Sequence, residues 1–479
     1  MDIVALIAGS LLSWLLGTTV LLVLRGARRP LAAPGEMAWL AGAGYLAGSF
    51  LLTLWMRALS LGGVPFGVPF GVPAIALPCL AVTVVAGYVA WRRHGNALIA
   101  ASRAAARALV ASPGLVGAAR VLWWIAIGWL ALRFALLALE VAWRPLYPWD
   151  AWIQWATKAK VWYELGRIVP FARAEEWYPA LGSVYFDMSP EYPPTMPLLQ
   201  VWSCLLLGRW DDALMNWPWW QIALALALLV YGALRWFETT ALAALAGAFL
   251  VSSLPLANVH VALAGYADLP MAAYYTAAAL ALVRWNTTCD SRDAALWIFF
   301  AFACTQIKNP GLVWAVTLLP AAIIAIAPKR GRKIIATGIG IALLLVIVLA
   351  LTQTKVFQYE LRLNFDPAWG ALAESYFVLG NWHLLWYGAI GAALLAGRRL
   401  FAPPLAPVTT ILAGGILFLA FVFAFSNARA WATDQTTVNR ATLHLAPLIA
   451  VLVVLAFQDF AARWRAVHAR ATASAPAAR

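Results

Sequence analysis

The chain begins with MDIVALIAGSLLSWLLGTTVLLVLRGARR (residues 1–29), an apolar run that ends in a basic cluster. A hydrocarbon layer of roughly 30 Å requires about 20 apolar residues for each helical crossing, and this run is long enough. Its positive charges follow the apolar residues, which is the reverse of a cleavable secretory signal. We therefore interpret this stretch as a retained transmembrane helix whose N-terminus lies outside the cytoplasm.

The composition extends this interpretation to the whole chain. Of the 479 residues, 64% are hydrophobic and 11% are charged, and the mean hydropathy is +0.79. A chain with so much apolar surface uses lipid as its solvent. The apolar runs predict an all-α polytopic membrane protein of about thirteen transmembrane helices. These helices are expected near residues 3–24, 37–56, 72–91, 118–140, 213–234, 240–257, 269–284, 294–307, 310–327, 334–352, 377–396, 407–425 and 441–457.

The formal net charge of +14 is better explained by basic residues retained in cytoplasmic loops than by binding to a nucleic acid. With the N-terminus outside, every strongly basic cluster falls on the cytoplasmic side of the predicted threading. These clusters lie at 25–29, 92–120, 328–333, 397–399 and in the tail after 458. The C-terminus is then cytoplasmic, and we expect no nucleic-acid partner.

One apolar segment, MPLLQVWSCLLLG (196–208), is too short to cross the bilayer comfortably. We interpret it as an interfacial or re-entrant helix on the outer face, so that 141–212 forms one long outer loop rich in Trp and Tyr. The chain then divides into three N-terminal transmembrane helices with a basic cytoplasmic loop (1–117), a core that contains the long outer loop (118–352), and C-terminal transmembrane helices with a short basic tail (353–479).

The first candidate for chemistry is Asp150 in PLYPWDAW (145–152), flanked by Trp149 and Trp152. It follows an apolar helix and precedes an amphipathic one, so its carboxylate is expected where membrane meets water. Partial desolvation there would raise its basicity toward that of a general base. Asp is also favoured as the N-cap of a helix, and the local sequence leaves both interpretations open.

Two further acids are expected on the outer face. Glu191 in SPEYPP (189–194) precedes a Pro-Pro pair that starts the short helix. It is either a solvated residue or a second carboxylate opposite Asp150, available for a metal, a sugar hydroxyl or a cation. Asp268 in GYADLP (265–270) has His260 nearby, and an acid close to membrane depth is a functional candidate, whereas a lone His is more often satisfied by one hydrogen bond.

The outer cations are Lys308 in IKNPG (307–311) and Arg440 in NRATLHLAPL (439–448), where His444 follows one turn later. Such residues either reach up to lipid headgroups or hold a phosphate.

Arg133 and Glu140 share a face of the fourth helix and are expected to pair. Sequence motifs of nucleotide hydrolases, zinc proteases and serine hydrolases are absent. No nucleotide is expected on the outer face of an inner membrane, so a transferase there would need its activated group on a lipid carrier.

Taken together, WDAW, the aromatic helices that follow it, EYPP, GYADLP, IKNPG and NRATLHLAPL resemble motifs of the GT-C superfamily of membrane glycosyltransferases. This superfamily contains the protein O-mannosyltransferases, the lipid A aminoarabinose transferases and the oligosaccharyltransferases. The resemblance covers about residues 118–457. It implies an inverting glycosyltransferase in the bacterial inner (plasma) membrane that moves a sugar from a polyprenyl-phosphate donor to a glycan, lipid or protein acceptor on the periplasmic face.

The resemblance also implies roles for single residues. Asp150 looks like the first-loop aspartate that acts on the acceptor nucleophile, and Asp268 resembles the second-loop acid. Tyr192, after Glu191, replaces a Lys that would bind the carrier phosphate in some members, so Lys308 or Arg440 is expected to do so here. The expected substrate-binding residues are Glu191, Tyr192, Asp268, His260, Lys308, Arg440, His444, Trp149 and Trp152.

Two questions stay open at this stage. Some relatives need no metal, so a divalent metal held by Glu191, Asp268 and His260 is possible but not required. The alternative function is a transporter or flippase of a lipid-linked saccharide. Acids at the outer helix ends and the lack of repeated halves favour the enzyme, because transporters place ionisable groups near the bilayer midplane.

Overall fold

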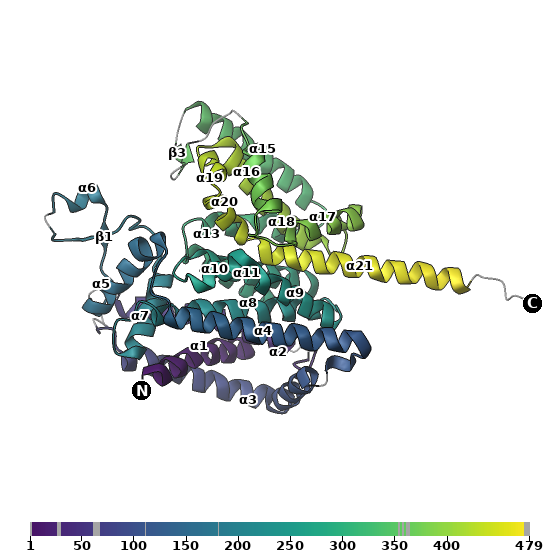
Figure 1. Cartoon of the computed structure of the whole chain (residues 1–479), viewed down its shortest axis with the longest axis horizontal. Coiled ribbons are helices and arrows are strands. Elements are labelled where there is room, and N and C mark those ends of the chain that lie inside the picture. The colour runs from purple at the N-terminus through teal and green to yellow at the C-terminus, as the bar shows by residue number, and fades with distance from the viewer. Residues whose placement is uncertain are drawn as a thin grey trace, which may run out of the picture.

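The computed structural model describes residues 2–25, 30–60, 68–110, 112–180, 182–352, 355–356, 359–360 and 365–473, and these are almost entirely helical (Figure 1). Most of the basic cluster at 25–29 lies outside the described residues. The α-helices are α1 Asp2–Leu24, α2 Glu36–Ser60, α3 Val72–Val110, α4 Gly117–Trp143, α5 Thr157–Leu165, α6 Ala174–Trp177, α7 Thr195–Leu207, α8 Trp217–Trp236, α9 Ala241–Ser253, α10 Pro255–Ala262, α11 Asp268–Thr288, α12 Ser291–Thr305, α13 Gly311–Thr317, α14 Leu319–Ile326, α15 Gly331–Leu351, α16 Trp369–Ala373, α17 Leu385–Ala396, α18 Ala406–Phe425, α19 Arg429–Thr433, α20 Thr437–Leu443 and α21 Ala446–Ala473.

Short irregular elements complete the fold. Strand β1 (Phe171–Ala172) pairs in parallel with β2 (Tyr185–Phe186), and β3 (Lys355–Val356) pairs antiparallel with β4 (Tyr359–Glu360). Two segments, Ala151–Ala156 and Glu374–Val378, form π-helical turns.

Eight predicted spans are confirmed as helices long and apolar enough to cross a membrane, within the part of the chain that is described. They contain α1, α2, α3, α4, α8, α15, α18 and α21, and α9 with α10, bent by 59°, makes a ninth if the pair is one span. The other predicted runs are shorter or less apolar. Helix α12 has 15 residues and α17 has 12, while the run 310–327 divides into α13 and α14. The protein is therefore a multi-pass membrane protein.

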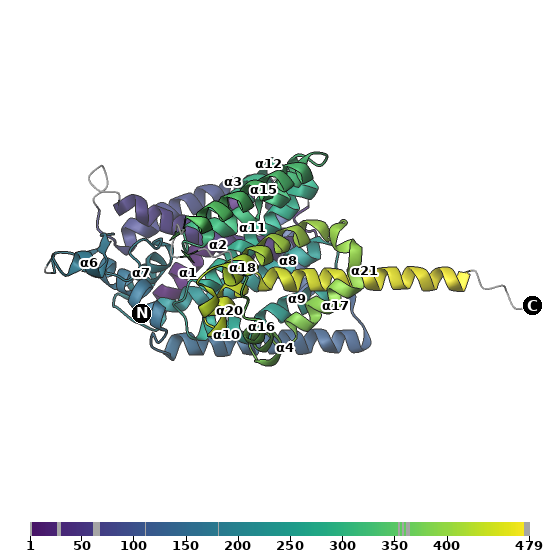
Figure 2. The same cartoon turned by 90° about the horizontal axis from the view of Figure 1, so that it is seen from above.

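The two ends of the helical bundle differ in character. Figures 1 and 2 both place α5, α6 and α7 at the end where α1 begins, and the end of α21 at the opposite end. The first end carries the Trp-rich segment, which is the long loop 141–212 of the sequence, and the second carries the basic final turns of α21. Thr195–Leu207, the short apolar segment of the sequence, forms α7 and packs against α1, α2 and α5.

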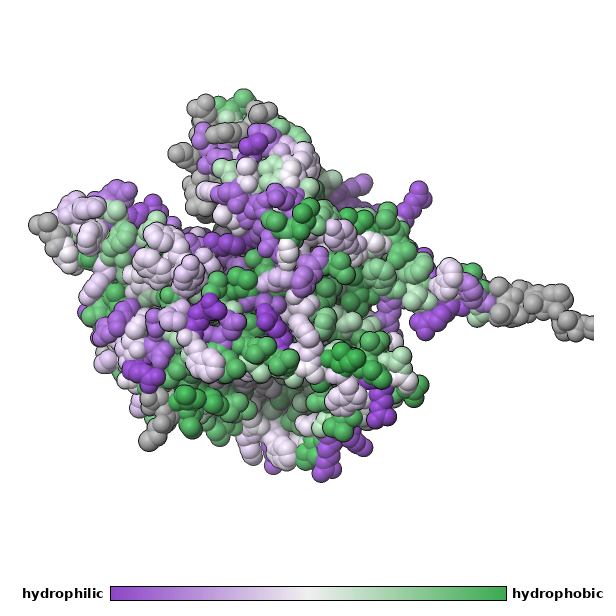
Figure 3. Space-filling model, in the orientation of Figure 1, coloured by the Kyte–Doolittle hydropathy of each residue, from purple (hydrophilic) through white to green (hydrophobic). Residues whose placement is uncertain are grey.

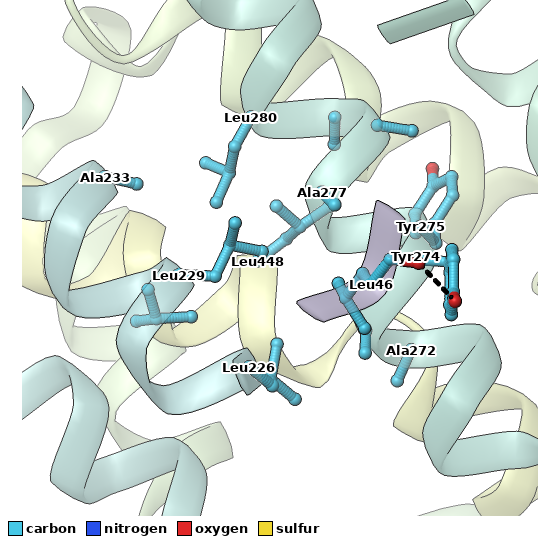
Figure 4. Close-up of a cluster of buried hydrophobic side chains, with 14 of the residues drawn as sticks. Leu46, Leu226, Leu229, Ala233, Ala272, Tyr274, Tyr275, Ala277, Leu280 and Leu448 are labelled. Atoms are coloured by element: carbon cyan, nitrogen blue, oxygen red, sulfur yellow. Dashed lines mark hydrogen bonds between the residues drawn. The ribbon is translucent and has the colours of Figure 1, made fainter. Parts of the chain in front are cut away.

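Helix α11 is the centre of the bundle. Every residue from Asp268 to Val283 is buried, and the helix contacts α2, α8, α12, α18 and α21. Figure 4 shows Tyr274, Ala277 and Leu280 of α11 among leucines of α2, α8 and α21, and the Tyr274 hydroxyl donates to the backbone oxygen of Leu46 at 2.7 Å. Because neighbouring helices surround it, α11 needs no strongly apolar outer surface, which explains why it is not among the eight spans.

Helices α1 and α2 approach each other through small residues. A Cβ atom built on Gly48 would lie 1.8 Å from the backbone oxygen of Ser13, and one on Gly17 would lie 1.8 Å from the backbone oxygen of Gly44. Such contacts allow two helix backbones to meet, and Gly44 and Gly48 have the spacing of a membrane helix-packing motif. The first span is therefore held by backbone contact with the second.

We predict that Gly48→Ala lowers the melting temperature of the purified protein in detergent, since α1 and α2 must separate to admit the methyl group. Overpacking of this kind costs about 1 to 3 kcal/mol. Gly87→Ala on α3 is the matched control, because its new Cβ would meet only the Thr19 methyl group at 3.6 Å. Equal melting temperatures for the two variants would contradict the close packing of α1 and α2.

Candidate functional site

An ionic cluster forms around the first residue of α11, at the end of the bundle that carries the Trp-rich segment. The Asp268 side chain is 1% exposed and lies between two cations. Lys308 Nζ donates to its Oδ1 at 2.8 Å, and Arg440 Nε donates to its Oδ2 at 2.8 Å. Three residues separated by up to 172 positions in the sequence therefore meet at one buried carboxylate.

Asp150 joins the cluster through Arg440. The Nη1 atom of Arg440 lies 2.6 Å from Oδ2 of Asp150, and the two side chains are 22% and 24% exposed. Asp150 occupies the N-cap position of the π-helical turn 151–156, but its side chain makes no capping hydrogen bond. The Asp150 side chain therefore does not act as an N-cap, which was one of the two interpretations that the sequence left open.

A close contact between two loops sets the position of Asp150. Gly265 has φ +114°, and a Cβ atom built on it would lie 2.5 Å from Cβ of Ala151. Only glycine combines this backbone conformation with this space. A π-helical turn starts at Ala151, and turns of this kind are frequent at functional sites. The loop before α11 thus supports the residue next to Asp150.

Helix α20 positions Arg440 through buried polar contacts with residues 375–382. Asn439 accepts hydrogen bonds from the Ser375 hydroxyl at 2.6 Å and from Trp382 Nε1 at 3.2 Å. The guanidinium group of Arg440 lies over the ring of Tyr266, with 4.3 Å between Cζ and the ring centroid. Arg440 is therefore held from both sides, by its own helix and by an aromatic face.

The two histidines complete the buried side of the cluster. His444 Nε2 donates to Oδ1 of Asp268 at 3.3 Å. His260 donates through Nδ1 to the backbone oxygen of Leu256 at 2.9 Å, and its Nε2 lies 4.0 Å from Oδ2 of Asp268. Both histidines are almost fully buried, so we infer that they support Asp268.

The remaining predicted residues lie outside this cluster. Glu191 is half exposed and pairs with Arg173 at 3.2 Å, and Tyr192 stacks on Trp155 with ring centroids 5.2 Å apart. Trp149 and Trp152 contact each other edge to face at 5.1 Å and are well exposed. The expected pair between Arg133 and Glu140 does not form. Arg133 donates instead to Asn258, and Glu140 pairs with Arg144 one turn away.

A metal does not fit the three residues named for it. Asp268 already receives hydrogen bonds from Lys308 and Arg440 on its two oxygens, and these cations would repel a divalent ion. Glu191 is engaged with Arg173. Within the described ranges, no group of three His, Cys, Asp or Glu side chains is arranged to hold a metal.

The sequence interpretation missed a second buried ion pair. Lys158 Nζ lies 3.3 Å from Oδ1 of Asp187 and donates to the backbone oxygen of Ser189 at 2.6 Å, and both side chains are at most 1% exposed. Desolvation lowers the pKa of Lys158 and raises the pKa of Asp187. One signal was available. The spacing of Trp155, Lys158 and Trp162 places the Lys on the apolar face of its helix.

We predict that Lys158→Met destabilises the segment that carries Asp150, because it leaves the Asp187 carboxylate buried without its cation. Breaking a buried pair from one side typically costs about 3 to 5 kcal/mol. Lys160→Met is the matched control, since Lys160 pairs with Glu164 on the surface of the same helix. Protease cleavage of residues 166–187 in the folded protein should increase only in the Lys158 variant, and unchanged cleavage would refute this role.

Figure 3 shows an indentation between the part of the molecule formed by α5 and α6 and the lobe formed by α16, α19 and α20, with hydrophilic residues at its base. Comparisons of the chain with protein-family models, with curated proteins and with solved structures gave no match. The function is therefore inferred from the chemistry of Asp150, Asp268, Lys308 and Arg440.

Proposed function

We propose that this protein is a GT-C type, inverting glycosyltransferase that moves a sugar from a polyprenyl-phosphate donor to an acceptor hydroxyl. The acceptor is a glycan, a lipid or a protein, and the reaction takes place at the extracytoplasmic face of a bacterial inner membrane. The observation that carries the proposal is the 2.6 Å contact between Asp150 and Arg440. It brings together a carboxylate and a cation that are each about a quarter exposed.

Asp150 is suited to act as the general base. Its Oδ2 atom is bound by Arg440, while Oδ1 makes no hydrogen bond to any described residue and is free to accept a proton. The acceptor hydroxyl would give its proton to Oδ1 as its oxygen attacks the anomeric carbon of the sugar. The bond between that carbon and the phosphate oxygen breaks with its electron pair leaving on the phosphate. Attack from the opposite face inverts the anomeric configuration.

The cations are suited to stabilise the leaving phosphate. The Lys308 ammonium group has three donors, of which Asp268 uses one, and the guanidinium of Arg440 has five. Asp268 is buried, so it orients these donors and is not expected to touch the substrate itself. Fixed donors in a partly desolvated site stabilise developing charge without having to reorganise. We propose that the donor phosphate binds beside Lys308 and Arg440.

The aromatic residues of the Trp-rich segment support a sugar ligand. Trp149 and Trp152 are exposed on both sides of Asp150 in the sequence, and exposed indole faces are suited to pack against the apolar faces of sugar rings. Tyr192 is stacked on Trp155, so we propose that it supports this segment and does not bind the sugar. We assign acceptor or donor sugar binding to Trp149 and Trp152.

The proposed threading keeps thirteen crossings, with the N-terminus outside and the C-terminus in the cytoplasm. The basic C-terminal part of α3, the basic residues between α14 and α15, and those after α17 then face the cytoplasm. The cluster around Asp268 faces the periplasm, where a lipid-linked donor is the available form of an activated sugar.

We predict that Asp150→Asn leaves the protein folded and reduces sugar transfer by about 100-fold or more, the contribution expected of a general base. The amide keeps the shape of the side chain and can still accept from Arg440, so the change isolates the proton-accepting role. Transfer is measured in proteoliposomes with a polyprenyl-phosphate sugar and envelope extracts as acceptor. The control is Glu164→Gln on α5. It removes one charge of an exposed ion pair with Lys160 and should retain activity.

Full activity of the Asp150 variant would remove this residue as the base. Loss of activity in both variants would point to a general disturbance of the loop. If neither the wild type nor any variant transfers sugar to any acceptor, the proposed reaction itself is refuted.

We also predict the orientation of the bundle. A Ser183→Cys variant should react with a membrane-impermeant maleimide in intact spheroplasts, because residue 183 lies in the Trp-rich segment. The native Cys289 is exposed at the turn between α11 and α12 and should react only after permeabilisation. The other three cysteines are buried and provide little background. Labelling in the reverse order would place the site on the cytoplasmic side.

A further inference from the structure

A second polar site lies where α4 passes the break between α9 and α10. Arg133 on α4 donates from Nε to Oδ1 of Asn258 at 3.0 Å. Among the described residues it has no acidic partner, and its two terminal nitrogens donate to none of them. The Asn258 amide is fully used, because it also donates to the backbone oxygens of Ser252 and Leu254 at 3.1 and 2.9 Å. Arg133 is thus oriented by a fixed acceptor with its charge left unmatched.

A cavity of about 310 Å³ opens beside this guanidinium group. Its polar lining comes from Arg133, Asn258, Ser253 and His383, and none of the described residues that line it is acidic. Leu132 and Leu136 also line it, and both are exposed on α4. The cavity therefore brings a cation next to an exposed apolar surface.

The depth of this site makes an unmatched charge costly. Arg133 lies ten residues before Trp143, the last residue of α4, which corresponds to about 15 Å along the helix axis. Ionisable groups at such depth are expensive and pair with another group or mark a ligand path. The backbone around Leu254 is also irregular, and irregular backbone at membrane depth is tolerated where it lines a polar cavity.

We propose that this cavity binds the phosphate group of a membrane lipid, with the lipid chains lying along Leu132 and Leu136 of α4. The terminal nitrogens of Arg133 would hold two phosphate oxygens, a geometry for which the planar guanidinium is suited. The exposed leucines select an amphipathic ligand over a free phosphate ion. This inference does not depend on the proposed transferase activity.

The charge balance separates this site from the cluster around Asp268. In that cluster, Lys308 and Arg440 are matched by the carboxylates of Asp268 and Asp150. Arg133 has no such partner, so an anion added there completes an ion pair without displacing one. Helix α10 connects the two sites, because Asn258 faces the cavity and His260 lies beside Asp268. A bound lipid would therefore brace the helix that supports the cluster.

The test measures lipid binding by native mass spectrometry of the purified full chain in detergent. We expect one phosphatidylglycerol to bind more tightly than phosphatidylcholine, and Arg133→Gln to weaken phosphatidylglycerol binding by about tenfold or more, as for the loss of a charge-assisted contact. Arg120→Gln, an exposed Arg on the same helix, should bind as the wild type does. Competition with a polyprenyl phosphate shows whether bulk phospholipid or the carrier lipid is the preferred source of the phosphate.

A second variant keeps Arg133 in place. Leu136→Trp should narrow the mouth of the cavity and weaken binding, whereas Leu139→Trp, on an exposed leucine that does not line the cavity, should not. This pair decides the question if Arg133→Gln fails to fold. Equal binding of phosphatidylglycerol and phosphatidylcholine to the wild type would overturn the proposal, as would unchanged binding in both the Arg133 and the Leu136 variants.

Discussion

The buried carboxylate of Asp268 is the interaction on which the arrangement of the protein depends. It stands at the first residue of the central helix and is contacted by Lys308 from the loop before α13 and by Arg440 and His444 from α20 and its C-cap. A buried charge without partners would be strongly unfavourable, and one partner lost from such a group costs several kcal/mol. The loop before α13 and helix α20 are thus brought to one place by the need to neutralise Asp268, and the Trp-rich segment joins them through the contact of Asp150 with Arg440.

The rest of the fold makes that neutralisation possible. Helix α11 is enclosed by neighbouring helices along its length, so its N-terminal residue cannot reach bulk water. In the charged cluster, Asp150 and Arg440 remain about a quarter exposed and Lys308 is 13% exposed, which leaves one acid and two cations for a ligand. Burial therefore divides the charged residues into a supporting set and a reachable set, and the proposed chemistry uses this division.

Much of the helical framework could be predicted from the sequence, because apolar runs of sufficient length have one structural outcome in lipid. The runs at 3–24, 118–140 and 334–352 form α1, α4 and α15 as expected. Runs such as 310–327 and 377–396 were harder to interpret, since an apolar composition does not reveal where a helix breaks. The bend between α9 and α10 and the division of α13 from α14 depend on tertiary contacts that hydropathy does not record.

The site was predictable in its residues more than in its contacts. Asp150, Asp268, Lys308 and Arg440 were recognised because charged groups at the ends of apolar helices are rare, and they do meet. Glu191 was expected beside them but pairs with Arg173, because its exposed loop position allows a nearer partner. The Lys158 and Asp187 pair escaped notice since a lysine among surface charges is usually solvated, and only its helical spacing shows the buried face.

The contact between Gly265 and Ala151 has a consequence for how such a chain can diverge. Two loops that touch with no room for a methyl group must keep their lengths and register together, so insertions are not tolerated on either side of that point. Residues 173–180 and 182–186, by contrast, are mostly exposed, and changes of length are expected to be tolerated there. Variation in ligand preference would then accumulate in these residues, while the spacing between Asp150 and Arg440 is inherited unchanged.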